Sequence, residues 1–135
     1  MTYEDFITAV AARAQASEEQ ARAITDATLE TLAERISAGE AEDLAAQPEL
    51  PDRLADHLRK TPVRENAQAF GLGEFVRRVS QRAGVDGSMA QAGAHAVLAT
   101  LRDAVPAYEF NDMQAQLPKD YWAVTQPLSM QRGAR

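Results

Sequence analysis

Residues 3–47, YEDFITAVAARAQASEEQARAITDATLETLAERISAGEAEDLAAQ, recur in altered form as residues 72–116, LGEFVRRVSQRAGVDGSMAQAGAHAVLATLRDAVPAYEFNDMQAQ. The two stretches align without a gap, and fifteen of the 45 aligned positions are identical. The identical pairs run from Phe6 with Phe75 to Gln47 with Gln116. Similarity of this extent at a fixed offset indicates an internal duplication.

Each copy has the hydrophobic spacing of helices of unequal length. Apolar residues at three-to-four spacing define one face of a short first helix, which Thr2 and Asp5 can cap in the first copy. A long second helix begins with the capping box Ser17–Gln20, or in the second copy with Ser88 or Asp86. It carries an arc of large apolar residues and an arc of small ones, so we expect it to be packed on two sides. The small residues are Ala23, Ala27, Thr31, Ala92, Ala96 and Thr100.

Two shorter segments complete each copy. A third helix is expected at about Glu40 to Gln47 and Glu109 to Gln116, and Pro51 and Pro118 suit the first position of a fourth segment. We therefore predict an all-α fold, a compact helical bundle built from two tandem, pseudo-symmetric repeats. The single domain covers residues 1–124, with repeat one at about 3–59, a linker at about 60–71 and repeat two at about 72–124. Residues 125–135 lack periodicity and are predicted to form a flexible tail.

Composition narrows the class of protein. The 135 residues suit one domain, and 45% hydrophobic with 25% charged residues is typical of a soluble globular chain. A net charge of −6, with acids concentrated in the first 50 residues, argues against binding nucleic acid or an anionic membrane. There is no cysteine, and no apolar run reaches the roughly twenty residues of a membrane span. Glu4 and Asp5 stand where a secretory signal has basic residues, so we expect a cytoplasmic protein.

The shared motifs of the copies are F-x-x-x-V, then A-x-x-x-L-x-x-L-x-x-x-I/V, then E-x-x-D-L/M-x-x-Q before a Leu-Pro step. Over about residues 3–124 this pattern resembles the bacterial family catalogued as domain of unknown function 2267, most clearly in Glu74–Val85 and Asp112–Tyr121. The resemblance implies an all-helical fold and no established activity, so it supplies no catalytic residues. The first copy departs from the pattern at Gln47–Pro51, where two extra residues precede the Leu-Pro step.

The strongest candidate site is a set of acids and glutamines that recurs in the third helix of each copy. Acids at i and i+3 share a helix face, where they can contribute to a carboxylate metal site or an acid/base pair. Acids in a first helical turn also cap free N–H groups, and a glutamine can bond back across the turn. We adopt this capping and packing interpretation and assign no catalytic, metal or cofactor site. The set is Glu40, Asp43, Gln47, Glu109, Asp112 and Gln116.

Other candidate surface residues are Arg77, Arg78 and Trp122. The arginines form a solvated helix face or bind an acidic partner, and Trp122 belongs to an aromatic group that is either part of the core or an exposed anchor. His57 and His95 lack metal-ligand spacing, and a zinc site needs three or four ligands. Nucleophile and phosphate-loop motifs are absent from the sequence.

These observations favour a non-enzymatic helical module that binds a protein partner or associates with itself. Self-association would join the acidic first copy of one molecule to the basic stretch around Arg77, Arg78 and Arg82 of another. The alternative is a small apolar or amphipathic ligand bound between the two repeats. An enzyme is the third hypothesis and rests on the paired acids alone.

Overall fold

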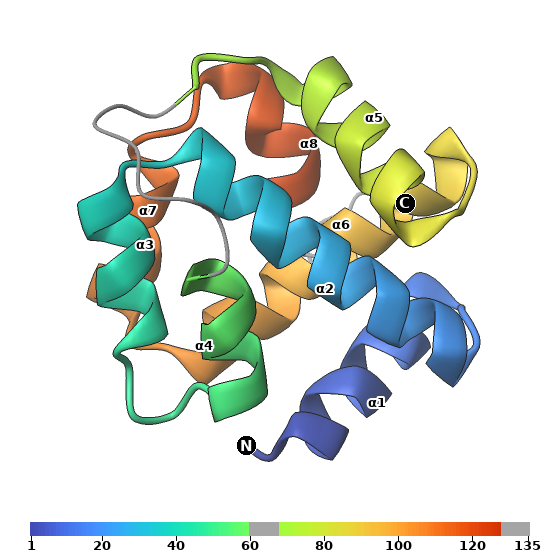
Figure 1. Ribbon diagram of the computed structural model, residues 1–135, viewed down its shortest axis with the longest axis horizontal. Helices are drawn as coiled ribbons and strands as arrows, with labels where there is room; N and C mark the ends of the chain where they lie inside the picture. The colour runs from blue at the N-terminus through green and yellow to red at the C-terminus, as the bar shows by residue number, and fades with distance from the viewer. Residues whose placement is uncertain (60–67, 128–135) are drawn as a thin grey trace.

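The computed structural model of the protein describes residues 1–59 and 68–127, and this part of the chain contains eight α-helices, one short 3-10 helix and no strand (Figure 1). The predicted all-α class is confirmed. The first half forms α1 (Tyr3–Ala14), α2 (Glu18–Arg35), α3 (Ala38–Ala45) and α4 (Asp52–Arg59). The second half forms α5 (Leu72–Ala83), α6 (Gly87–Ala104), α7 (Ala107–Gln114), the 3-10 helix η1 (Lys119–Tyr121) and α8 (Trp122–Thr125).

Side-chain caps fix the starts of the first helices. The Thr2 hydroxyl accepts a hydrogen bond from the Asp5 N–H at 3.0 Å, and the Asp5 carboxylate accepts one from the Thr2 N–H. Ser17 and Gln20 form the same reciprocal box before α2, as predicted. In the second copy it is Asp86 that caps α6, because its carboxylate accepts the Met89 N–H at 2.8 Å.

The third helix of each copy begins and ends two residues earlier than predicted. Ser37 is the N-cap of α3, since its hydroxyl accepts the Glu40 N–H at 3.1 Å, and Pro106 occupies the same position before α7. Glu40 and Glu109 are therefore the third residue of their helices rather than the first.

The fourth segments differ between the copies. Pro51 lies just before α4 and its carbonyl accepts the Ala55 N–H at 3.1 Å, so the proline flanks the helix rather than beginning it. Pro118 likewise precedes η1, and the chain then makes only the four-residue α8. Thr125, the first residue of the predicted tail, is buried at the end of α8. Residues 60–67 of the predicted linker and 128–135 of the predicted tail lie outside the described residues.

The short first helix of each half packs against the long helix of the other half. Helix α1 lies against α6, and α5 lies against α2 (Figure 1). Corresponding residues make corresponding contacts at these two places. The Arg13 guanidinium donates to Thr100 Oγ1 at 2.8 Å and to Asp103 at 2.7 Å, and that of Arg82 donates to Thr31 Oγ1 at 2.8 Å and to Glu34 at 2.7 Å. The two halves therefore share one hydrophobic core.

The long helices α2 and α6 are themselves in contact. Gly93 of α6 lies against Ile24 of α2, and a Cβ atom added at Gly93 would come within 2.5 Å of the Ile24 Cγ2 atom. The predicted small arc is buried from its second member onward, at Ala27, Thr31, Ala96 and Thr100. It does not extend to Ala92, which is exposed. Large and small residues thus interlock at this crossing.

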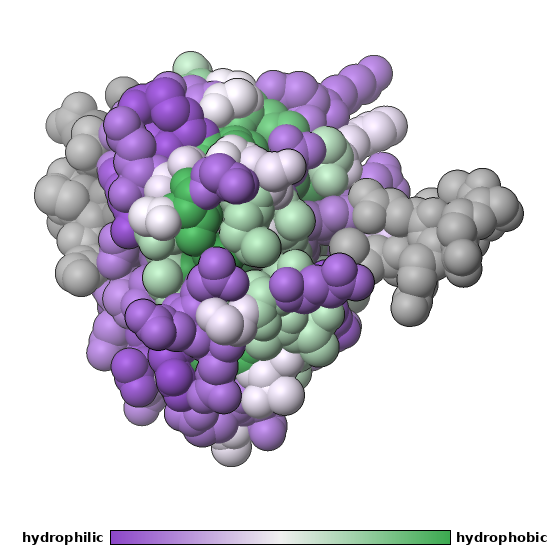
Figure 2. Space-filling view, turned by 90° about the vertical axis from the view of Figure 1, so that its right-hand side faces the viewer, coloured by the Kyte–Doolittle hydropathy of each residue, from purple (hydrophilic) through white to green (hydrophobic). Residues whose placement is uncertain are grey.

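Hydrophobic residues that pack against the core are partly exposed at the end of the molecule that carries the α1–α2 and α5–α6 turns. Figure 2 looks at this side and shows hydrophobic residues gathered in the middle of the face, with polar residues around them. Partly buried hydrophobic residues in and beside the two turns include Ala16, Val85 and Met89. Among the described residues, no helix is long and apolar enough to cross a membrane.

Candidate functional site

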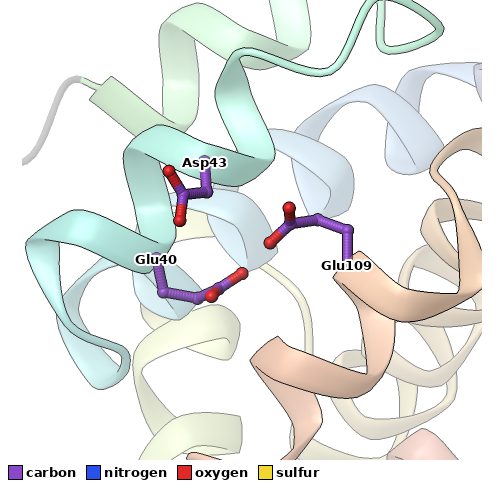
Figure 3. Close-up of side chains that lie close together, drawn as sticks. All are labelled: Glu40, Asp43 and Glu109. Carbon is purple, nitrogen blue, oxygen red and sulfur yellow. The ribbon is translucent and has the colours of Figure 1, made fainter.

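Helices α3 and α7 bring the recurring acids of the two halves together. Glu40 and Asp43 extend from α3 and Glu109 from α7, and one carboxylate oxygen of each lies within 4.8 Å of the others (Figure 3). In this view Glu40 and Glu109 point toward one another across the space between the helices. We call Glu40, Asp43 and Glu109 the acid cluster.

The two glutamates of the acid cluster are buried, which corrects their prediction as surface residues. Glu40 is 7% exposed and Glu109 is 5% exposed, whereas Asp43 is exposed. Within the described residues, the Oε2 atoms of both glutamates are buried without a hydrogen-bond partner. An unpaired polar atom in a protein interior carries a desolvation cost, and each such atom calls for a physical explanation.

The surrounding glutamines hold the two helices together. The Gln47 amide donates to the backbone carbonyl of Asp43 and to Oε1 of Glu109, both at 3.1 Å. The first of these bonds is the predicted one across the helical turn. Gln116 makes the corresponding link in the other direction, because its Oε1 accepts the Ser37 N–H at 2.7 Å. The Ser37 hydroxyl caps α3, and the Ser37 N–H is taken up by Gln116. The Glu40 carboxylate therefore does not accept the Ser37 N–H, as it would in a capping box.

The electrostatic setting of Glu40 is unfavourable for a free carboxylate. Burial, followed by the adjacent Glu109 carboxylate and the charges of Asp43 and Asp112, raises the pKa of Glu40 to about 8. Two carboxylates this close are not both ionised unless a positive charge compensates them. The arrangement can therefore hold a shared proton or a cation. Its donors are all oxygen atoms, which suit hard cations such as Ca²⁺, Mg²⁺ and Mn²⁺.

The structure thus joins what the sequence presented as two separate sets. Four acids and two glutamines, three from each half of the chain, meet at one interface between α3 and α7. Asp112 is exposed and acts on Glu40 through its charge.

The predicted arginines are engaged within the chain. Arg77 donates two hydrogen bonds to the Glu74 carboxylate, at 2.7 and 2.6 Å. Arg78 donates to Glu74 at 2.7 Å and to Glu34 at 3.0 Å, and its guanidinium lies 4.0 Å from the centre of the Phe70 ring. These contacts, with that of Arg77 first, hold the pKa of Glu74 at about 2. The arginine charges are therefore satisfied by the protein's own acids, which weakens the hypothesis that they bind an acidic partner.

The aromatic group around Trp122 divides in two. Phe110 and Tyr121 belong to the core, and Tyr121 packs edge-to-face on Phe75 with ring centres 5.5 Å apart. Trp122 is 50% exposed and Tyr108 is 64% exposed. Both alternatives raised by the sequence are thus found, each in a different part of the group.

One polar cluster was not predicted. His57 of α4 lies between two acids of α2, with its Nδ1 atom 2.8 Å from Glu30 and its Nε2 atom 3.1 Å from Asp26. Asp26 and Glu30 are one helical turn apart in α2 but far from His57 in the sequence. The spacing of residues along the chain therefore does not indicate that the three side chains meet. The cluster ties α4 to the long helix.

Comparison with known protein families identifies a match. The family model described as "Uncharacterized conserved protein (DUF2267)" matches residues 3–124, the range over which the sequence resemblance was noted. A search of curated proteins gives no match.

Proposed function

The chain belongs to the DUF2267 family, whose description names no activity, and we propose that it is a non-enzymatic helical interaction module that binds a basic segment of a protein partner. The binding surface in this proposal is formed by α3, α4 and α7. These helices contact one another through α3 and lie together at the left of Figure 1.

The observation that carries the proposal is a surplus of exposed acids on these helices and in the α3–α4 turn, beside an exposed tyrosine. We call the acids the acidic surface. They are Glu42, Asp43, Glu49, Asp52, Asp56 and Asp112. Arg59 offsets one of these charges through its 2.9 Å pair with Glu42, and Arg53 lies over the Tyr3 ring, so the acids remain in excess over the two exposed arginines of α4. Tyr108 of α7 is the kind of side chain that anchors protein interfaces.

Charge complementarity supports a basic protein partner over self-association. A negative surface attracts a positive partner over about a Debye length and speeds their encounter. Self-association through the arginines of α5 has less support, since Arg77 and Arg78 already pair with Glu74 and Glu34. The acidic surface fits a partner segment rich in lysine or arginine.

The other hypotheses have less support from the geometry. An apolar ligand between the repeats would need space at the α2–α6 crossing, where Gly93 packs directly against Ile24. A surface hollow beside α6 and α8 is lined largely by polar residues, among them Ser88, Gln91 and His95. For an enzyme, the buried positions of the two glutamates leave little access for a substrate.

Fluorescence anisotropy with a labelled Arg- and Leu-containing peptide tests the proposal, with a glutamine-for-arginine peptide as control. We expect binding that weakens at least fivefold between about 0.05 and 0.3 M salt, where the Debye length shortens. Asp52→Asn with Asp56→Asn, and separately Tyr108→Ala, should each weaken it several-fold.

The matched control removes two acids at the distant start of α2, by Glu18→Gln with Glu19→Gln. Equal losses in both double variants would reduce the effect to overall charge and refute a specific surface. No binding of the basic peptide would overturn the proposal. A stable dimer in light scattering, abolished by Tyr108→Ala, would assign the surface to self-association instead.

A further inference from the structure

We propose that Glu40, Asp43 and Glu109 bind one hard divalent cation of the size of Ca²⁺ between α3 and α7. This site rests on other observations than the proposed peptide binding, with which it shares only Asp43. It would link corresponding helices from the two halves of the chain.

Unpartnered buried oxygens point to a ligand at this position. Glu40 and Glu109 are both more than nine-tenths buried, and the Oε2 atom of each is without a hydrogen-bond partner among the described residues. Figure 3 shows the two carboxylates directed into the same space between the helices. A cation placed there would coordinate both oxygens and offset the repulsion between the carboxylates.

The three carboxylates are close enough to share one cation, and their arrangement favours Ca²⁺. One oxygen from each of the three acids lies within 4.8 Å of the others. Oxygens within that limit can be neighbouring ligands of one ion. Ca²⁺ accepts six to eight oxygen ligands in a flexible geometry, whereas Mg²⁺ demands near-ideal octahedral geometry and gives up its water reluctantly. Three carboxylates fixed on two helices therefore suit Ca²⁺ better than Mg²⁺.

The donor set and the access route agree with this assignment. All three ligands are carboxylates, which prefer hard cations to the soft metals that thiolates select. Oε1 of Glu109 already accepts a hydrogen bond from the Gln47 amide, which leaves Oε2 as its oxygen without a partner for an ion. Asp43 is exposed, which gives an ion and its remaining water ligands access from solvent.

Calorimetric titration of chelator-treated protein with CaCl₂ tests the site. We expect one Ca²⁺ per chain with a Kd of roughly 10⁻⁵ to 10⁻³ M, the weaker end of protein calcium sites, and at least fivefold weaker binding of Mg²⁺. Ca²⁺ at ten times the Kd should raise the Tm by several degrees, roughly, since it binds only the folded chain. KCl at equal ionic strength should leave the Tm unchanged.

Glu40→Gln and Glu109→Gln should each weaken Ca²⁺ binding at least tenfold. Both substitutions keep the size of the side chain and remove a repelling charge, so the variants should fold, as circular dichroism will show. Glu42→Gln is the matched control, because Glu42 lies on the same helix but is exposed and paired with Arg59.

Two results would overturn the site. The first is wild-type protein that binds no Ca²⁺ at millimolar concentration, which would leave a shared proton as the resolution of the pair. The second is Ca²⁺ binding that survives Glu40→Gln and Glu109→Gln but is lost in Glu42→Gln, which would be an adventitious surface ion only. Repeating the peptide titration in the presence of a chelator shows whether the peptide binds without a cation. Failure of the cation site can then be told apart from failure of the peptide-binding proposal.

Discussion

Replacing Gly93 with alanine tests whether the two long helices approach as closely as the structure shows. Gly93 is buried within α6, and its position corresponds in the repeat to Ile24 of α2, the residue it contacts. A Cβ atom at Gly93 would lie 2.5 Å from Cγ2, 2.9 Å from Cδ1 and 3.4 Å from Cβ of Ile24. At least one of the two helices must therefore shift, or Ile24 must change its rotamer.

Two opposing effects decide the magnitude. Alanine in place of glycine within a helix favours folding by about 1 kcal/mol. Overpacking a core costs about 1–3 kcal/mol, and here the upper part of that range applies because Ile24 is fully buried and β-branched, with little rotamer freedom. We expect Gly93→Ala to lower the free energy of unfolding by about 1–2 kcal/mol, on balance of these two effects.

Urea denaturation followed by circular dichroism measures the change, with Gly73→Ala as the matched control. Gly73 lies near the start of α5 and an added Cβ meets no atom within 4 Å, so alanine there should be neutral or stabilising. Truncating Ile24 to alanine should cost less in the Gly93→Ala background than in wild type, by at least about 1 kcal/mol of coupling. If Gly93→Ala proves as stable as Gly73→Ala, the close crossing of α2 and α6 is refuted.

Three further measurements test contacts between elements that are distant in the sequence. Arg82→Ala should cost about 1–2 kcal/mol in urea denaturation and Arg13→Ala about half as much, because the partner carboxylate is 12% exposed for Arg82 (Glu34) and 49% for Arg13 (Asp103). Burial opposes ionisation of Glu34, but its arginine partners lower its pKa below the ordinary value. Its folded pKa thus lies below its unfolded pKa, so the stability advantage of wild type over Glu34→Gln should be full above about pH 5 and shrink as the pH falls. Tyr121→Phe removes hydroxyl bonds of 2.8 and 3.2 Å to two backbone carbonyls and should cost about 0.5–1.5 kcal/mol, measured in the same assay.

Local signals made the helices predictable. The capping box at Ser17–Gln20 and the apolar spacing of α1 act over a few residues, so the sequence shows them directly. The recurring acid motif predicts that α3 begins at Glu40, whereas the helix begins at Ala38. Ser37 is itself a good capping residue, and its hydroxyl marks the start two residues before that of the prediction.

The packing between the halves was not predictable from these signals. An internal alignment shows which residues correspond, but not which helix of one copy contacts which helix of the other. The alignment therefore identified Glu40 and Glu109 as equivalent and gave no sign that they meet or that both are buried. The engagement of Arg78 with Glu34 has the same origin, since the pair spans 44 residues, whereas its bond to Glu74 at i−4 was within reach of a sequence argument.

The contacts between the halves also explain where the two copies differ. Arg13 and Arg82 each contact a threonine that is identical in both copies, so one chemical solution serves both places. Where a residue meets its own counterpart, identity is a cost: two isoleucines at the Ile24–Gly93 contact would collide. Glu40 and Glu109 are the exception, since they are identical, meet each other and carry like charges. Such a pair is unfavourable unless something positive lies between them. It is this mismatch with the rest of the interface that makes the acid cluster the place to look for a bound ion.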